Sequence, residues 1–171
     1  MIRMRSVIVG IGIFGAAAVI ALACSSPSST ATAQEVTPSE ASFAPLGLVL
    51  IQACGTLDCH GQVGRNLRIY GNTGLRLSSA NVPTSLTPTT ADEISQDFGS
   101  VVGLEPEIMS EVAADKGVDP ERLTFYRKAR GLESHKGGTI VLPGDARDVC
   151  ITSWLSGSID EAQCTVALTY P

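Results

Sequence analysis

The stretch Cys54-Gly55-Thr56-Leu57-Asp58-Cys59-His60-Gly61 decides how this chain is interpreted. A histidine directly follows the second of two cysteines, which is the order of residues in a covalent c-type haem motif. In such a motif the two thiols bond to the porphyrin, and the adjacent imidazole becomes the proximal iron ligand. The usual motif has two residues between the cysteines, whereas this chain has four. We therefore expect Cys54 and Cys59 to hold a haem and His60 to ligate its iron.

Few side chains can supply a sixth iron ligand, because residues 24–171 contain one other histidine, His135, and one methionine, Met109. His135 lies in the polar, glycine-flanked segment ESHKGG, where a ligand can be aimed without backbone strain. Met109 lies on the apolar stripe of an expected helix, where a lone methionine is more often core filler. We favour His135 as the distal axial ligand, with Met109 and an open sixth position as alternatives.

Two haem-free interpretations of the motif stay open at this point. Cys54 and Cys59 are near enough in sequence to form a small-loop disulfide, with His60 as a polar neighbour. Alternatively, these three residues and His135 provide the ligand number of a zinc or copper site. An oxidising export route disfavours the metal site, because it tends to pair free thiols.

Residues 1–23 have the pattern of a signal peptide of the lipoprotein type. Arg3 and Arg5 precede an almost wholly apolar run over residues 7–23, and Cys24 follows directly. The end of this run resembles a bacterial lipobox, in which the cysteine becomes the lipidated first residue of the mature protein. We expect an exported protein that is lipid-anchored through Cys24 to a bacterial membrane, facing the periplasm or the cell surface. A plain secreted protein and an uncleaved anchor are the alternatives.

A tether and one domain are expected after the signal. Following Cys24, the tether over residues 24–42 reads SSPSSTATAQEVTPSEAS, without a basic or aromatic residue. Such a stretch buries too little apolar surface to offset the entropy of ordering, so we expect it to be disordered. The remaining residues, 43–171, have the length of a single domain.

Charge and motifs exclude several classes of function. The chain has 12 basic and 17 acidic residues and a formal net charge of −5, which becomes −7 without residues 1–23. No basic stripe interleaved with aromatic residues occurs, so a nucleic-acid partner is not expected. The sequence contains neither the nucleophile elbow G-x-S-x-G nor a P-loop. We therefore expect an electron carrier rather than an enzyme.

The five cysteines divide into Cys24, the motif pair and a late pair, Cys150 and Cys164. An exported chain seldom keeps an unpaired thiol, and four cysteines remain after lipidation of Cys24. The late pair has no neighbouring histidine and no metal-ligand spacing. We expect it to form a structural disulfide that stabilises the fold by about 3 kcal/mol.

Hydrophobic periodicity and punctuation predict a mainly α domain of short helices. The pair Thr90 and Glu93 is a capping box at the start of a helix that runs to about residue 102. Gly71-Asn72-Thr73-Gly74 is flanked by two short apolar arms, which predicts a small β-hairpin over residues 66–77. Further helices are expected over residues 43–53, 105–116, 120–130 and 145–155, and a short strand over residues 139–142.

An apolar first helix, a Cys…Cys-His motif, short helices and a late helix bearing Trp154 resemble the class I cytochrome c arrangement. The stretches CGTLDCHG, GRNLRIYG, SHKGG and VCITSWL resemble those of small bacterial cytochrome c-like lipoproteins, over most of residues 43–164. The resemblance implies a cytochrome c-like domain with one covalent haem c. It also implies a membrane-tethered carrier of single electrons between redox protein partners outside the cytoplasm.

Two further roles would follow from a bound haem. Gly61 would let the backbone turn closely beneath the porphyrin, and the cluster Arg127, Lys128 and Arg130 would pair with its propionates. That cluster is otherwise a solvated helix face. The alternative function of a different class is a haem-free, disulfide-stabilised surface lipoprotein that acts as a binding or envelope module.

Overall fold

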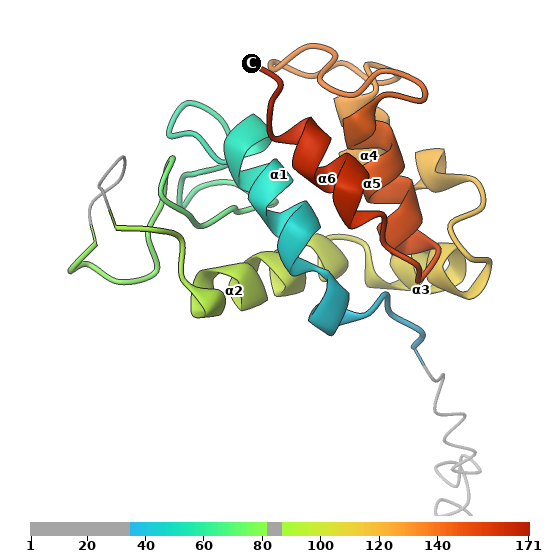
Figure 1. Cartoon of the computed structure of the whole chain (residues 1–171), viewed down its shortest axis with the longest axis horizontal. Helices are drawn as coiled ribbons and strands as arrows, with labels where there is room; N and C mark the ends of the chain where they lie inside the picture. Colours follow the sequence, from blue (N-terminus) through green and yellow to red (C-terminus); the bar gives the residue numbers. More distant parts are fainter. Residues whose placement is uncertain (1–34, 82–86) are drawn as a thin grey trace, which may run out of the picture. The chain divides into compact units, whose positions relative to one another are not determined.

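The computed structural model describes residues 35–81 and 87–171 (Figure 1). Within these residues there are six α-helices and two short 3-10 helices, and no strand. The mainly α fold class is therefore confirmed. The expected signal peptide, Cys24 and the tether up to residue 34 lie outside the described residues. None of the described helices is long and apolar enough to cross a membrane.

The predicted helices are confirmed, with small shifts at their ends. The helices run in the order η1 (Glu40–Ser42), α1 (Ala44–Cys54), α2 (Ala91–Val102), α3 (Pro106–Ala114), η2 (Pro120–Arg122), α4 (Thr124–Ala129), α5 (Ala146–Leu155) and α6 (Glu161–Ala167). The helix expected over residues 120–130 is divided into η2 and α4, because Leu123 between them has extended backbone angles. Helix α6 was not predicted.

Helix α2 begins with the predicted capping box. The Thr90 hydroxyl accepts a hydrogen bond from the Glu93 backbone N–H at 3.2 Å, and the Glu93 carboxylate accepts one from the Thr90 N–H at 2.9 Å. Glu93 is also fully buried and pairs with Arg76 at 2.8 Å. The Leu77 N–H donates to the same carboxylate at 3.1 Å. One glutamate thus caps the helix and fixes the incoming chain against it.

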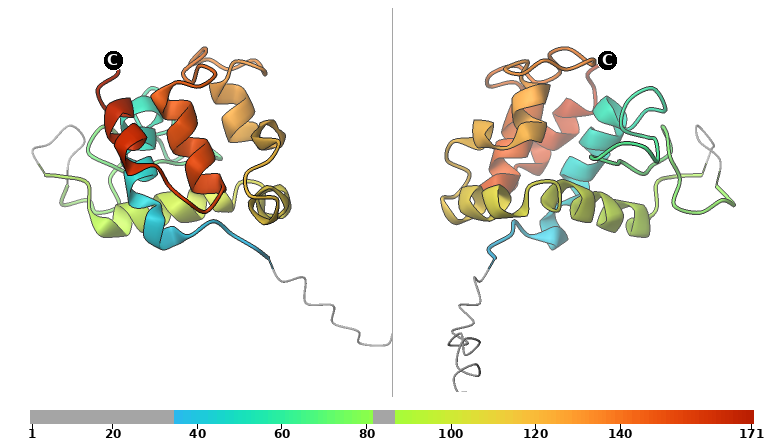
Figure 2. Two further views of the ribbon diagram at one scale, coloured as in Figure 1. Left: turned by 45° about the vertical axis from the view of Figure 1, so that its right-hand side comes forward. Right: turned by 180° about the vertical axis from the view of Figure 1, so that it is seen from behind.

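The core lies where α1, α2, α5 and α6 meet. Trp154 of α5 is fully buried, and its ring meets Phe43 edge-to-face, with 5.2 Å between ring centroids. Phe98 of α2 packs against both rings. Helices α5 and α6 lie side by side in Figures 1 and 2, and the predicted Cys150–Cys164 disulfide joins them.

The described end of the expected tether packs against the domain. The Val36 N–H donates to the Ser110 hydroxyl at 2.9 Å, and the Trp154 indole N–H donates to the Ser39 carbonyl at 3.2 Å. The Ser95 hydroxyl donates to the Glu40 carboxylate at 2.6 Å. Residues 36–42 therefore belong to the folded unit, which begins before the expected boundary at residue 43.

The β-structure expected from the sequence is not confirmed. Residues 66–77 contain one isolated bridge, between Tyr70 and Leu75, rather than a pair of strands. Residues 139–142 form no strand either, because the N–H groups of Ile140 and Val141 both donate to the Ala129 carbonyl. The chain in both places is held by individual hydrogen bonds instead of a ladder.

Candidate functional site

A cavity of about 370 Å³ brings together three of the residues that the sequence singles out: Cys54, His60 and His135. Its volume falls within the range of ligand pockets, roughly 300–1,000 Å³. The walls are formed by α1, the loop after it, α4, the loop before α5 and α5 itself. Apolar side chains provide most of the lining: Val49, Leu50, Leu67, Leu104, Phe125, Ile140, Val141 and Ile151.

The two histidines of the chain face each other across a short gap. The ring centroids of His60 and His135 are 5.9 Å apart, and the ring planes are inclined by 25°. Two imidazoles that bind one metal ion from opposite sides, each through a bond of about 2 Å, have centroids roughly 6 Å apart. The observed centroid separation is close to this value.

Hydrogen bonds at the Nδ1 atoms orient both rings for ligation. His60 Nδ1 lies 2.8 Å from the Leu67 carbonyl oxygen, and His135 Nδ1 lies 3.4 Å from the Gly138 carbonyl oxygen. A carbonyl only accepts, so each Nδ1 is the donor and each Nε2 keeps its lone pair. Metal-ligating histidines are usually held in this way. Within residues 35–81 and 87–171, neither Nε2 makes a hydrogen bond.

Burial also keeps His60 in the form that binds metal. Desolvation by the surrounding side chains lowers the pKa of His60 below its usual value, and the neighbouring His135 and Arg65 act in the same direction. The bond to the Leu67 carbonyl opposes this shift without overcoming it. His60 is therefore neutral at pH 7, as an imidazole ligand has to be.

The backbone between the motif cysteines forms a compact turn that places His60. Cys54 ends α1, and the His60 N–H donates back to the Cys54 carbonyl at 2.9 Å. The N–H groups of Cys59 and Gly61 both donate to the Thr56 carbonyl at 2.9 Å. The four residues between the cysteines thus form a hydrogen-bonded turn. This turn brings the backbone of His60 back to Cys54 at the end of α1.

Close packing of the backbone requires a glycine at position 61. A Cβ atom at Gly61 would lie 2.1 Å from the Gly55 carbonyl oxygen, and one at Gly74 would lie 1.9 Å from the same atom. Gly61 does not line the cavity. The backbone around Gly55 can therefore pack closely only because positions 61 and 74 carry no side chain. This packing stabilises the turn.

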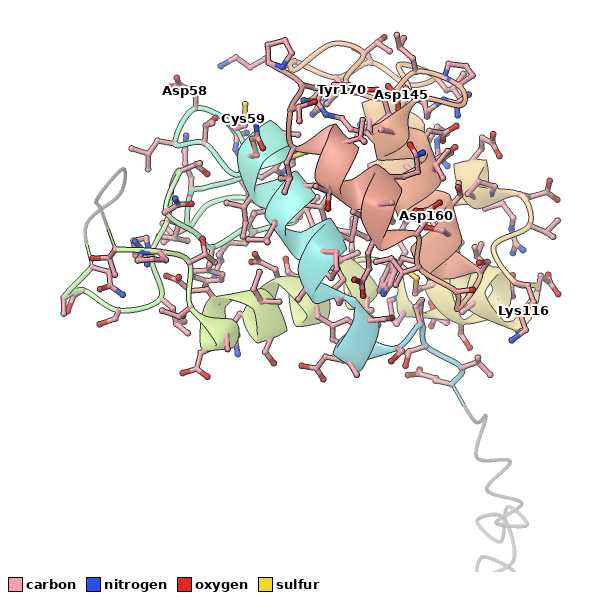
Figure 3. All side chains as sticks on the ribbon, in the orientation of Figure 1. Asp58, Cys59, Lys116, Asp145, Asp160 and Tyr170 are labelled. Carbon is pink, nitrogen blue, oxygen red and sulfur yellow. A yellow bond between two sulfur atoms is a disulfide. The ribbon has the colours of Figure 1, made fainter. Side chains whose placement is uncertain are left out.

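The two motif cysteines are free thiols, so the small-loop disulfide is not formed. Cys54 lines the cavity, and burial raises the pKa of its thiol to about 11, partly offset by the charge of Arg147. Cys59 is half-buried on the loop after α1 (Figure 3) and is not part of the cavity lining. The structure thus brings one of the two cysteines to the histidines.

Positive charge collects at the cavity. Arg65, Lys128 and Arg147 line it, and no acidic side chain among the described residues does. Arg147 is only 8% exposed, and its Nε has no hydrogen-bond partner in the described part of the chain. Of the basic cluster expected to meet propionates, Lys128 alone lines the cavity. Arg127 and Lys128 both pair with Glu133, and Arg130 pairs with Asp148.

The structure places Met109 away from this site. Its side chain is fully buried in the hydrophobic core, on α3, and does not line the cavity. Among the residues that the structure describes, no group of three or more His, Cys, Asp or Glu side chains could hold a metal ion. The zinc or copper site of four ligands is therefore not assembled, whereas a haem iron needs only two axial ligands from the protein.

Several residues of the site were not found from the sequence. Leu104 lies between α2 and α3, Thr124 and Phe125 lie on α4, and Arg147 lies on α5; no motif connects them to His60 or His135. One signal for Arg147 exists in the sequence. It is a charged residue on the largely apolar, buried face of the helix DARDVCITSWL.

No protein-family model, curated protein or solved structure matches this chain. The resemblance to cytochrome c-like lipoproteins therefore stays a prediction from the motif.

Proposed function

We propose that this protein is a membrane-tethered, monohaem c-type cytochrome that carries single electrons between redox protein partners outside the cytoplasm. Its described helices would then be those of a cytochrome c-like domain. The observation that supports this proposal best is the pairing of His60 and His135 in an apolar cavity that Cys54 also lines.

Each site residue has a role in holding the haem. Cys54 and Cys59 would carry the porphyrin covalently, and His60 and His135 would be the axial ligands. When bound, the haem supplies one-electron chemistry. The protein would supply two imidazoles and apolar walls that exclude water, and both would limit the structural rearrangement that accompanies a change in iron charge.

The charges of the cavity favour the same ligand. A haem is flat and apolar but carries two carboxylates, and these need cations or water. Arg147 places a buried guanidinium at the cavity, where its terminal nitrogens donate to the Ile140 and Pro171 carbonyls, while Arg65 and Lys128 add positive charge to the lining. An apolar cavity with three cations and no carboxylate matches this combination.

The signal and Cys24 complete the proposal. Export would take the chain to the compartment in which c-type cytochromes and disulfides form, and lipidation of Cys24 would attach it to a membrane. The residues that follow Cys24 would let the domain reach its electron donor and acceptor, which are proteins of the same compartment.

A haem-free binding module is the second candidate. It is favoured by one observation, the position of Cys59 outside the cavity lining. In that case the same cavity would take a smaller apolar anion, and the Cys150–Cys164 disulfide would be the feature that suits the chain to an oxidising compartment.

Expression of the full chain in a bacterium with a c-type haem maturation system tests the proposal. We expect a reduced c-type visible spectrum and a mass increased by one haem. His135→Ala is expected to change the spectrum from low-spin to high-spin, whereas Met109→Ala, the matched control, leaves it low-spin. A colourless chain, made where a control cytochrome matures normally, would support the binding module.

A further inference from the structure

The segment that orients His60 is held by hydrogen bonds from a helix that never touches the cavity. The Leu67 carbonyl, which accepts the His60 Nδ1 proton, belongs to the irregular segment 67–70. The N–H of Arg68 donates to the Ser100 hydroxyl at 2.9 Å, and the N–H of Tyr70 donates to the Asp97 carboxyl at 2.7 Å. Neither Asp97 nor Ser100 lines the cavity.

Segment 67–70 also returns to His60 through its own backbone. The N–H of Ile69 donates to the His60 carbonyl at 3.0 Å, and the Ile69 side chain is fully buried. The N–H groups of three successive residues are thus used in alternation: residues 68 and 70 toward α2, and residue 69 toward His60. A shift of this segment relative to α2 would therefore move both hydrogen bonds that the segment makes with His60.

Asp97 is a costly residue to keep at such a position. Its side chain is fully buried, one carboxyl oxygen has no partner among the described residues, and no cation pairs with it. Glu93, four residues earlier, is committed to Arg76, Leu77 and Thr90. A buried carboxyl that is half satisfied costs free energy which an apolar side chain would not. Among the described residues, its side chain makes one hydrogen bond, which it accepts from the Tyr70 N–H.

We propose that Asp97 and Ser100 are positioning residues for His60: from α2 they hold segment 67–70, so that the Leu67 carbonyl fixes the imidazole in the Nδ1–H tautomer. The inference rests on the proposed function for its purpose, because a fixed Nε2 lone pair is what an axial ligand needs. The geometry itself concerns only the polypeptide, so it is testable without haem.

Nitrogen NMR of the histidine rings in the haem-free full chain, expressed without haem maturation, is the direct test. In the unsubstituted protein we expect His60 as the Nδ1–H tautomer alone. Asp97→Ala, which removes the acceptor, is expected to give a mixture of both tautomers. Asp97→Asn keeps an acceptor oxygen and is expected to keep the single tautomer. A change in stability alone would not alter the tautomer ratio in the folded chain.

Glu105→Ala is the matched control. Glu105 also accepts hydrogen bonds from a distant segment, the N–H and hydroxyl of Thr124 at 2.6 and 2.7 Å, but it does not contact segment 67–70. It is expected to leave the His60 tautomer unchanged. A folded Asp97→Ala chain with the single Nδ1–H tautomer would overturn the proposal, as would an equal change in the Glu105→Ala control.

Ser100→Ala keeps the test decisive if Asp97→Ala does not fold. Loss of one hydrogen bond worth about 1 kcal/mol is expected to speed solvent exchange of the His60 Nδ1 proton roughly fivefold. Unchanged exchange in this variant would contradict the proposal. If the chain takes up no haem at all, the proposed function fails while these ring measurements still decide the role of Asp97 and Ser100.

Discussion

The two histidines come from parts of the molecule that are held very differently. His60 lies in a turn that is bonded to Cys54, Ile69 and Leu67 and packed against glycine backbone. His135 lies in the segment over residues 131–139, most of which is exposed, and its Nδ1 contact to Gly138 is long, at 3.4 Å. His60 is thus held by several contacts, whereas His135 lies in a mostly exposed segment and has one long hydrogen bond.

This difference suggests a division of roles. Covalent attachment requires the cysteines and the proximal imidazole to be in place together, so rigidity is needed around residues 54–60. Under the proposed function, the mostly exposed segment over residues 131–139 (the distal loop) would have to admit a large flat group. The distal loop is connected to α4, where Arg127 and Lys128 pair with Glu133 and the Arg127 carbonyl accepts from the Leu132 N–H.

The largest expected effect comes from removing each histidine in turn. His60→Ala should abolish haem incorporation, because the fixed ligand and its bond to Leu67 are lost together. His135→Ala should retain the covalent haem and lose only the sixth ligand. Haem content and the visible spectrum of both variants measure this. Equal haem loss in the two variants would contradict the expected difference between the two segments that carry the histidines.

The free energy of unfolding of two glycine variants measures how tightly the two regions are packed. Gly61→Ala places a Cβ 2.1 Å from a backbone oxygen, so we expect a loss of roughly 3 kcal/mol or more. Gly138→Ala meets no atom within 4 Å, and only its φ of 70° is unfavourable, so about 1 kcal/mol is expected. Urea unfolding of both variants gives the values. A larger loss at Gly138 would reverse the comparison.

Asp97 gives the rigid region a pH dependence. Burial raises the pKa of Asp97 to about 8, with the neighbouring Glu93 acting in the same direction, whereas the unfolded value is about 4. The folded chain therefore binds one more proton between these values, and the free energy of unfolding falls as the pH rises through this range.

Asp97 dominates the interval from pH 6.5 to 8.5, because the lowered pKa of His60 acts mainly below it and the raised pKa of Cys54 acts mainly above it. We expect the free energy of unfolding to fall by roughly 1–2 kcal/mol across the interval. Asp97→Asn should flatten the curve. An unchanged slope in that variant would assign the dependence to another group.

The smallest expected effect lies in the distal loop. Glu133 pairs with Lys128 and Arg127, and these contacts lower the pKa of Glu133, but its side chain is exposed to solvent. Exposed ion pairs contribute little to stability. Glu133→Gln is therefore expected to leave the thermal midpoint within measurement error. A clear fall would mean that the loop is held more firmly than its contacts indicate.

Local signals in the sequence predicted the parts of the fold that local contacts determine. The capping box of Thr90 and Glu93 is present as predicted, because its two hydrogen bonds join residues three apart. The missed helix α6 had a comparable signal, since the Asp160 carboxylate accepts from the Gln163 N–H. A helix of this length gives a weak periodic pattern, so it was missed. Its disulfide to α5 is a tertiary contact, which local sequence patterns do not show.

The hairpin and most of the cavity depended on contacts that the sequence does not show. In residues 66–77 the N–H groups of Arg68 and Tyr70 bond to side chains of α2, so they are not available to a second strand. The pairing of His60 with His135 was expected from an inventory of ligands. The contribution of Arg147 arises from the packing of α5 beside α1 and was not predictable from spacing.

The mass of the peptide that spans Cys54 to His60, released from the full chain after export through a c-type haem maturation system, tests the central claim most directly. The account predicts one haem bonded to this peptide through both cysteines, with the Cys150–Cys164 disulfide intact in the same preparation. A peptide without haem, either with two free thiols or with a Cys54–Cys59 disulfide, alongside a control cytochrome that matures normally, would contradict it.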